Sequence, residues 1–172
     1  DHATFSYGKL QFASMSFKGM FSNRQDTTRV QGNSNSIVNI THFNGLASQI
    51  PVKGSIVITQ LDDPFIKLNV SSALNHKHIN QQLDTTKMVL RKGNFNAHID
   101  YSGKLSEYLD DDRSAYKGKL KGDITASNVS FIYQPKQLKF SEVNVVATFN
   151  EKIFNIKTLS LNAYGNTVRM RG

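Results

Sequence analysis

A strand signature near the start of the chain returns near its end at one fixed offset of 128 residues. The first copy reads LQFASMSFKGMF and the second LKFSEVNVVATF, each with a one-residue slip in its apolar alternation. The slip, after Phe12 and after Phe140, predicts a β-bulge in both copies. A repeated strand unit that cannot bury its own apolar face must stack on its neighbours, which favours an extended β assembly over an enzyme. The matching positions are Leu10, Phe12, Met15, Phe17 and Phe21, and Leu138, Phe140, Val143, Val145 and Phe149.

Composition and length indicate one folded domain. The chain has 172 residues, of which 38% are hydrophobic, and it contains no Cys, which excludes disulfides and zinc–thiolate sites. We expect a single β domain over residues 1–172, with repeat units around 9–54 and 137–172. The opening DHATFSYGKLQF has neither the basic nor the apolar region of a signal peptide. We therefore interpret the chain as a fragment of a longer protein, with any membrane anchor outside it.

The chain carries a formal net charge of +8, which raises the question of an anionic partner. In the segment 116–124, YKGKLKGDI, the lysines alternate with apolar residues and glycines. This alternation is typical of the solvated face of a strand, where charges also discourage edge-to-edge aggregation. No clustered basic and aromatic pattern indicates a nucleic-acid surface. We therefore expect no nucleic-acid partner.

Period-2 alternation dominates the chain and predicts an all-β fold of antiparallel strands joined by short turns. Two segments, 76–84 and 104–109, break this pattern, and each is expected to form a short helix. Such a helix either caps an apolar groove or connects two strands and packs its apolar side on the sheet. The expected strands cover residues 9–12, 15–21, 28–31, 36–41, 52–61, 65–74, 94–101, 116–126, 129–133, 137–140, 143–149, 153–161 and 167–171.

No catalytic, cofactor or metal motif occurs in the sequence. Nucleophile elbows, phosphate-binding loops, dinucleotide fingerprints and the HExxH zinc motif are all missing. His76 and His78 form an HxH pair with no evident third ligand, and the acidic run 110–112 lacks the spacing of a calcium loop. We therefore expect a protein that is not an enzyme and that needs no cofactor or metal.

The strands supply a one-sided apolar face, and either protein or lipid must cover it. A sheet with such a face folds over as a sandwich, closes into a barrel or curls into a groove. We expect a strongly curved, repeated antiparallel sheet that forms a groove or an open barrel. Gly118 and Gly122 leave space beside Leu120, either for a ligand chain or to relieve a curved strand. The candidate lipid-facing or core positions are Phe12, Phe17, Phe21, Ile56, Ile58, Leu68, Val70, Phe95, Ile99, Leu120, Ile124, Phe131, Phe140, Val145 and Phe149.

The run from residue 101 to the end resembles the AsmA-like family, particularly its large Bacteroidota members. The shared features are a GxLxGxI strand, an NVSFxY hairpin arm, an FxxVxVxxxF unit, an FNIxxLSL strand and a closing GNxVxMxG strand. Residues 52–75 fit the same style less tightly. The first fifty residues match mainly through the internal repeat.

This resemblance implies a protein tethered to the inner membrane, with a periplasmic body of repeated β units related to bridge-like lipid-transfer proteins. Phospholipid acyl chains and flanking repeats of the same protein are the partners that it implies, and outer-membrane assembly is the process. It implies no catalytic residue. The alternative is a structural β-sandwich or solenoid module that holds no ligand. A polysaccharide-binding domain is less favoured, because the chain has no Trp and most aromatics point inward.

Overall fold

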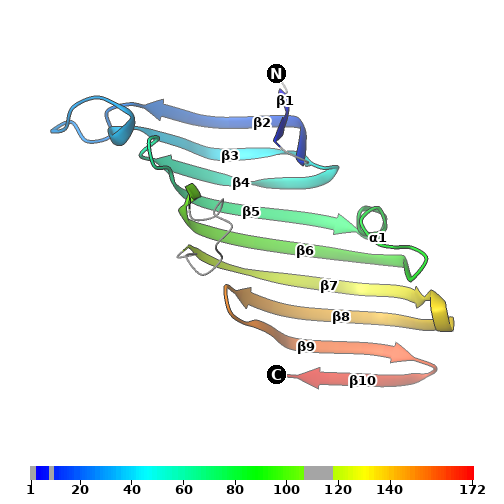
Figure 1. Cartoon of the computed structure of the whole chain (residues 1–172). Helices are drawn as coiled ribbons and strands as arrows, with labels where there is room; N and C mark the ends of the chain where they lie inside the picture. Colours follow the sequence, from blue (N-terminus) through cyan, green and yellow to red (C-terminus); the bar gives the residue numbers. More distant parts are fainter. Residues whose placement is uncertain (1–2, 8–9, 107–117) are drawn as a thin grey trace. The chain divides into compact units, whose positions relative to one another are not determined.

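The computed structural model describes residues 3–7, 10–106 and 118–172 and shows an all-β chain. Ten strands form one antiparallel sheet in which the strand order follows the chain order, so the sheet begins at β1 and ends at β10 (Figure 1). The predicted all-β, antiparallel fold is therefore confirmed. The strands are β1 (Ala3–Tyr7), β2 (Leu10–Ser22), β3 (Ile37–Ala47), β4 (Ile50–Thr59), β5 (Phe65–Asn75), β6 (Met88–Lys104), β7 (Lys119–Tyr133), β8 (Leu138–Asn150), β9 (Phe154–Ala163) and β10 (Asn166–Arg171).

Most expected strands fall within these elements, with three differences. The pairs of short strands expected at 9–21, 116–133 and 137–149 are single long strands, β2, β7 and β8, because a bulge does not end a strand. Strand β1 was not expected. The strand expected at 28–31 is wrong, because this segment lies in the connection between β2 and β3, where Val30 is 88% exposed.

The helix expected at 76–84 is present as α1 (His76–Asn80). Its Asn75 cap accepts hydrogen bonds from the N–H groups of Lys77 and His78, and His78 Nδ1 accepts one from Asn75 N–H, which completes a capping box. The second expected helix, 104–109, and the acidic run 110–112 lie largely or wholly outside the described residues.

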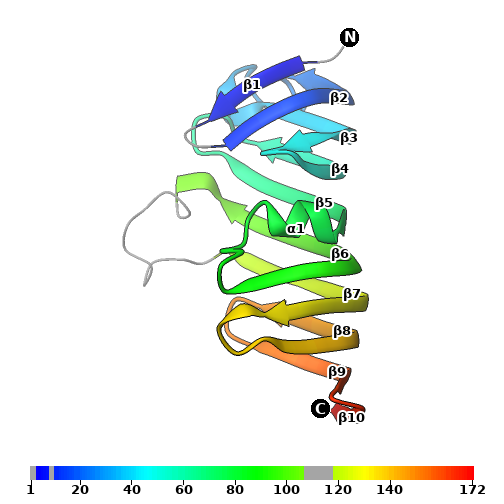
Figure 2. The same ribbon diagram turned by 90° about the vertical axis from the view of Figure 1, so that its right-hand side faces the viewer.

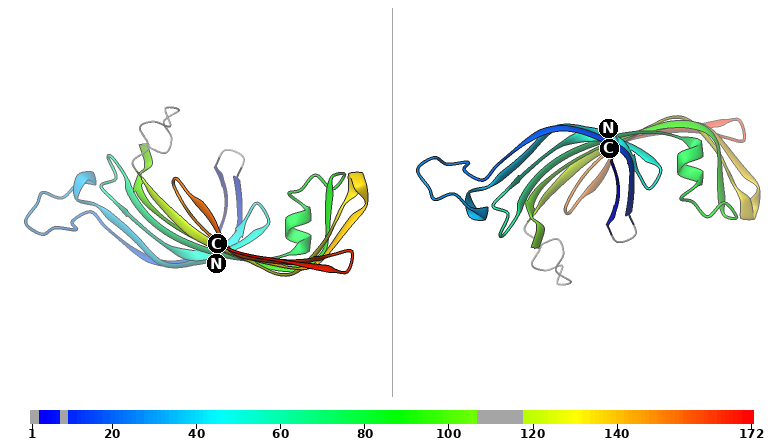
Figure 3. Two further views of the ribbon diagram at one scale, coloured as in Figure 1. Left: turned by 90° about the horizontal axis from the view of Figure 1, so that it is seen from below. Right: turned by 90° about the horizontal axis from the view of Figure 1, so that it is seen from above.

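The chain divides into two compact units. Unit 1 comprises residues 1–48, 52–71 and 99–121, and unit 2 comprises residues 49–51, 72–98 and 122–172. Unit 2 contains a core cluster of Leu90, Val129 and Val143 from three successive strands. Ile79 of α1 and Leu83, which follows α1, pack against this cluster. Figures 2 and 3 show α1 beside β5 and β6.

The hairpin β2–β3 and the hairpin β8–β9 have the same register. Both first strands have 13 residues, and each of the eight partner pairs between β8 and β9 has its equivalent between β2 and β3. Both hairpins also carry two register shifts at equivalent places. The predicted bulge after Phe12 and Phe140 is one of them. Equivalent pairs include Phe12–Ala47 and Phe140–Ala163, Phe17–Phe43 and Val145–Leu159, and Phe21–Val38 and Phe149–Phe154.

The equivalence continues into the third strand of each copy. A two-residue turn follows each second strand, Ser48-Gln49 before β4 and Tyr164-Gly165 before β10, and all four residues have positive φ. This is the conformation of a type I′ turn, whose twist matches that of the flanking strands. The offset is 128 on the first strands (140 − 12) and 116 on the second (163 − 47), so the β2–β3 connection is longer by 128 − 116 = 12 residues.

Candidate functional site

In unit 1, the apolar residues of β2 to β5 share one face of the sheet. Phe17 pairs with Phe43, and a Cβ placed on Gly54 would meet the Phe43 ring at 3.0 Å, so the two aromatic side chains lie on the face of Gly54. Register places Val70 opposite Gly54, Leu68 opposite Ile56 and Ile66 opposite Ile58, all on this same face. We call this set the unit 1 apolar face: Phe17, Phe21, Val38, Phe43, Ile56, Ile58, Ile66, Leu68 and Val70.

The unit 1 apolar face leaves large side chains in contact with solvent. Phe17 is 63% exposed and Phe21 61% exposed, although a Phe side chain contributes about 1.5 to 3 kcal/mol when it is buried. Among the described residues of unit 1, Met15 is the one apolar side chain that is buried. Exposed apolar side chains that lie together on a sheet make this face a candidate interaction surface.

In unit 2, the protein's own side chains cover much of the equivalent apolar surface. Phe131 and Phe140 stack with ring centroids 4.7 Å apart and an interplanar angle of 19°. Both pack against the core cluster, together with Phe95, Val145 and the side chains that follow α1. Four of the candidates in unit 2, Phe95, Phe131, Phe140 and Val145, therefore belong to a core.

The space beside Gly122 is filled by protein. A Cβ on Gly122 would lie 2.5 Å from the Phe149 ring and 2.3 Å from the His98 carbonyl oxygen. Of the two roles considered for this glycine, the observed packing supports the structural one, because Phe149 occupies the position of a ligand chain. Gly118 is buried and lies close to Gly103.

The structure brings together only some of the candidate positions. Phe17 and Phe21 are exposed, and every other candidate is half-buried. The candidate set omits Ile66, although it alternates with Leu68 and Val70, and the alternation missed Val38 and Phe43. Cross-strand register places all three on the face. The candidates in unit 1 are Phe12, Phe17, Phe21, Ile56, Ile58, Leu68, Val70, Ile99 and Leu120, and those in unit 2 are Phe95, Ile124, Phe131, Phe140, Val145 and Phe149.

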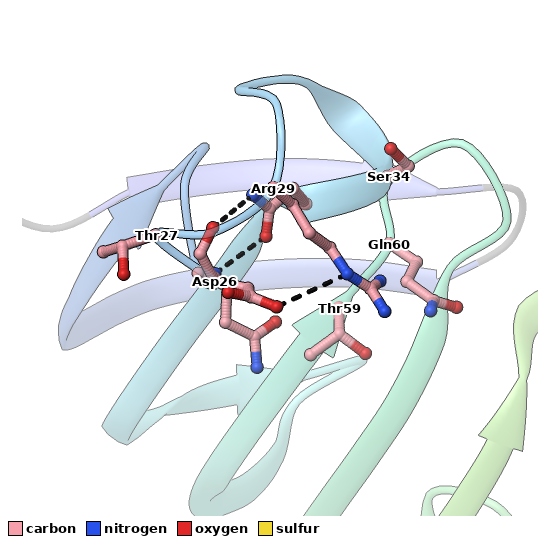
Figure 4. A pocket seen from close by; sticks show the side chains of 8 residues that line it. Asp26, Thr27, Arg29, Ser34, Thr59 and Gln60 are labelled. Atoms are coloured by element: carbon pink, nitrogen blue, oxygen red, sulfur yellow. Dashed lines mark hydrogen bonds and ion pairs between the residues drawn. The ribbon is translucent and has the colours of Figure 1, made fainter.

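A polar pocket of about 500 Å³ lies in unit 1, at the long β2–β3 connection (Figure 4). Sequence reasoning missed it, although the change of offset from 128 to 116 between equivalent strands marks the insertion that builds it. Its lining residues are Gln25, Asp26, Thr27, Arg29, Ser34, Asn35, Thr59 and Gln60.

Buried polar side chains hold this connection in place. Asn35 is 5% exposed; its amide accepts from Asp26 N–H at 2.8 Å and donates to the Asp26 and Val30 carbonyl oxygens at 2.8 and 3.2 Å. Ser36 is fully buried and donates to the Gly32 carbonyl oxygen at 2.7 Å. The pocket wall is therefore ordered by its own hydrogen bonds.

The charges at the pocket are paired with each other. Arg29 Nε lies 3.4 Å from Asp26 Oδ2. The Thr28 hydroxyl and N–H donate to the Asp26 carboxylate at 2.6 and 2.9 Å and, with Arg29, hold the pKa of this carboxyl below its usual value. A carboxylate that stays ionised and paired is a poor general base near neutral pH.

The described residues contain no group of three His, Asp or Glu side chains that could hold a metal ion. No helix within the described ranges is long and apolar enough to span a membrane. The comparisons add no relative: no family model, no curated protein and no solved structure matches this chain.

Proposed function

We propose that this chain is a non-enzymatic, periplasmic lipid-binding segment whose unit 1 apolar face contacts phospholipid acyl chains. One observation carries this proposal: Phe17 and Phe21 stand exposed on an apolar face whose cross-strand partners, Phe43 and Val38, are also apolar. Acyl chains have the shape and polarity to cover such a row.

The resemblance of the chain's second half to AsmA-like proteins supports a role in lipid transfer and outer-membrane assembly. On this proposal, the inner-membrane anchor lies outside the 172 residues, and lipid headgroups remain in water beside the basic side chains. The contrast between the units refines the proposal. Unit 1 provides the proposed contact surface, whereas Phe95, Phe131, Phe140 and Val145 of unit 2 pack on the core cluster.

The test is native mass spectrometry of protein purified without detergent, followed by identification of co-extracted lipid. The variant Phe17→Ser/Phe21→Ser removes two exposed rings from the face, and we expect it to lose bound phospholipid. The matched control is Met20→Ser on the same strand. Met20 is 59% exposed and points to the opposite side of the sheet, because successive strand residues alternate.

Equal lipid content in the Phe variant and the Met20→Ser control would contradict lipid binding at this face. Far-UV circular dichroism checks that both variants keep their strand content.

The alternative is a structural module without a ligand, and the packing of unit 2 favours it there. Phe131 stacks on Phe140, and Phe149 fills the space at Gly122, so these aromatics serve the fold. If the same experiment finds no lipid on the parent protein in any preparation, the structural role extends to unit 1 as well.

A further inference from the structure

The side of unit 1 opposite its apolar face carries lysine side chains. In β4, Lys53 precedes Gly54, and in β5, Lys67 lies between Ile66 and Leu68. Because Gly54 and the two apolar residues lie on the apolar face, alternation along the strands turns both lysines to the opposite side.

Three further lysines point to this same side. On β2, Lys18 follows Phe17, which lies on the apolar face. On β7, Lys121 Nζ lies 3.7 Å from Asp100 Oδ2. Asp100 Oδ1 accepts a hydrogen bond at 2.7 Å from the amide of Asn69, which shares the lysine side of β5 by alternation. Alternation also adds the lysine two residues before Lys121. We call this set the unit 1 basic face: Lys18, Lys53, Lys67, Lys119 and Lys121.

The positive charge on this face is largely uncompensated. Asp100 is the one acidic residue in the described strands of unit 1, so the five lysines and this Asp sum to 5 − 1 = +4. Lys121 pairs with Asp100, whereas no carboxylate in the described part of the chain pairs with the other four lysines. All five lysines are exposed. A surface built for solubility intersperses both signs of charge, so this single-sign face favours an anionic partner.

The five lysines come from four strands, which makes the basic face broad. Strands β2 and β7 are separated by five inter-strand spacings in the sheet order. At about 4.8 Å for each spacing, the lysines extend over about 24 Å. This spread matches a surface with many negative charges and exceeds one small anion.

The type of basic residue favours a lipid surface over a protein partner. The described strands of unit 1 contain no arginine. Arginine recognises a fixed carboxylate or phosphate with its planar fork, and it is enriched in protein interfaces, whereas lysine is depleted there. Lysine is a hydrated point charge that needs no fixed geometry, which suits the mobile phosphate groups of an anionic bilayer.

We propose that the unit 1 basic face binds the surface of a bilayer that contains anionic phospholipid. The lysine ammonium groups lie at the level of the lipid phosphates, where the attraction falls off within a Debye length of the surface. The apolar face lies on the other side of the same strands and takes no part in this contact. The interaction therefore goes beyond acyl-chain binding and does not depend on it.

Vesicle co-sedimentation tests this proposal on the 172-residue protein. One set of vesicles contains phosphatidylcholine alone, and the other contains phosphatidylcholine mixed with phosphatidylglycerol. We expect binding to the anionic vesicles to be at least about tenfold tighter. This binding should weaken when salt shortens the Debye length from about 10 Å at 0.1 M to about 3 Å at 1 M. Equal binding to both kinds of vesicle would overturn the proposal.

A triple variant removes charge from the basic face. Each lysine near an anionic surface contributes about fivefold to binding, so Lys18→Gln/Lys53→Gln/Lys67→Gln should weaken binding to the anionic vesicles about 100-fold. Far-UV circular dichroism checks that this variant keeps its strand content. If it does not, Lys53→Gln alone should weaken binding about fivefold.

A matched control separates this face from the overall charge of the chain. Lys77→Gln/Lys136→Gln/Lys152→Gln removes the same charge from exposed positions of unit 2 that lie outside its strands. We expect it to weaken binding less than about threefold, because these charges add only to the long-range attraction that salt screens. An equal loss in both triple variants would overturn the proposal.

Two further outcomes would also overturn it. Loss of vesicle binding in Phe17→Ser/Phe21→Ser would assign the bilayer contact to the apolar face. Tighter binding to duplex DNA or to polyglutamate than to the anionic vesicles, at equal negative charge, would identify another polyanion as the partner of the basic face.

Discussion

Three buried side chains, one methionine and two valines, owe their position to the same feature of the backbone. Met15, Val129 and Val143 are 7%, 4% and 8% exposed, and each directly follows a residue in the left-handed region: Ser14, Asn128 and Glu142, with φ of 51° to 52°. At Met15 and Val143 this pair of residues lies opposite a single residue of the next strand, so it forms a bulge with one extra residue. The left-handed residue absorbs the slip, so the apolar residue after it returns to the core.

Substitutions at Ser14 test the role of the left-handed residue. A left-handed conformation costs a non-glycine residue about 1 kcal/mol and costs a β-branched residue more. We expect Ser14→Gly to change the free energy of unfolding by less than about 1 kcal/mol and Ser14→Val to lower it by about 1 to 2 kcal/mol. Urea denaturation measures both. The control is Met20→Val, because Met20 pairs with Asn39 in regular register, and a loss there as large as at Ser14 would contradict the bulge argument.

Two Asp residues use the same local motif, Asp-Thr-Thr followed by a basic residue, at 26–29 and 84–87. In each, the second Thr donates its hydroxyl and N–H to the carboxylate, at 2.6 and 2.9 Å for Asp26 and at 2.5 and 3.1 Å for Asp84. The hydroxyl hydrogen bond is the largest cause that lowers each pKa.

We expect Thr28→Val to raise the pKa of Asp26 toward its ordinary value and to leave the pKa of Asp84 unchanged. Because the folded pKa of Asp26 lies below the unfolded one, the stabilisation is present above about pH 4 and is lost as the pH falls through the folded pKa. Carbonyl NMR titration of both Asp side chains measures the effect. A shift of Asp84 in place of Asp26 would refute the assignment.

At the scale of the element, α1 replaces a neighbouring strand at the start of β6. Strand β5 ends at Asn75, and the Asn80 amide then bonds both backbone groups of Leu90: it donates to the carbonyl oxygen at 2.8 Å and accepts from the N–H at 2.9 Å. A helix of five residues is marginal alone, so this contact and the packing of Ile79 hold it on the sheet.

Asn80→Ala should therefore loosen α1. The change leaves the N–H and C=O of the buried Leu90 without these partners, at a cost of about 1 to 3 kcal/mol. We expect faster amide hydrogen exchange at Leu90 and lower stability in urea. Asn80→Asp keeps one hydrogen-bond acceptor, so its stability and its exchange rate at Leu90 should lie between those of Asn80→Ala and the parent protein. Unchanged exchange at Leu90 in Asn80→Ala would show that Asn80 does not hold α1 on the sheet.

For the whole molecule, comparison of the two repeat copies explains why the first copy has the polar pocket and the second copy does not. Both copies share the length of the first strand, the bulges and the turn conformation, yet the β2–β3 connection is twelve residues longer than its equivalent by the difference of offsets, 128 − 116. The extra residues form the pocket wall, with Asn35 and Ser36 buried within it. The equivalent hairpin of the second copy, β8–β9, closes without these twelve residues, so they are an insertion in the first copy.

Replacing residues 22–36 with Asn-Glu-Lys, the sequence of Asn150–Lys152, should give a hairpin like β8–β9, which closes through Asn150 N–H and the Ile153 carbonyl oxygen at 2.9 Å. We expect cooperative unfolding with a free energy within about 2 kcal/mol of the parent, because a shorter loop offsets part of the lost hydrogen bonds. Non-cooperative thermal unfolding would show that the insertion is required for the fold.

Local alternation was enough to locate β2 to β10 and the shared bulge, because side chains on a strand alternate whatever the strand packs against. It missed β1. The same rule failed at 28–31, TRVQ, because Thr28 bonds Asp26 within a turn. The pocket was missed for a related reason. Its residues converge through Asn35 hydrogen bonds between positions five and nine residues apart, which alternation does not register.

The sequence by itself determined that this chain is a repeated antiparallel sheet with one apolar side, since the period of two and the 128-residue offset are both written in it. Only the tertiary structure decided which part of that side is core. Phe17 and Val145 hold equivalent places in the repeat, yet Phe17 is 63% exposed whereas Val145 packs on the core cluster. The reason is physical, because Ile79 and Leu83 cover that cluster in unit 2. The alternation along one strand shows which residues share a face, but not which other residues pack on that face.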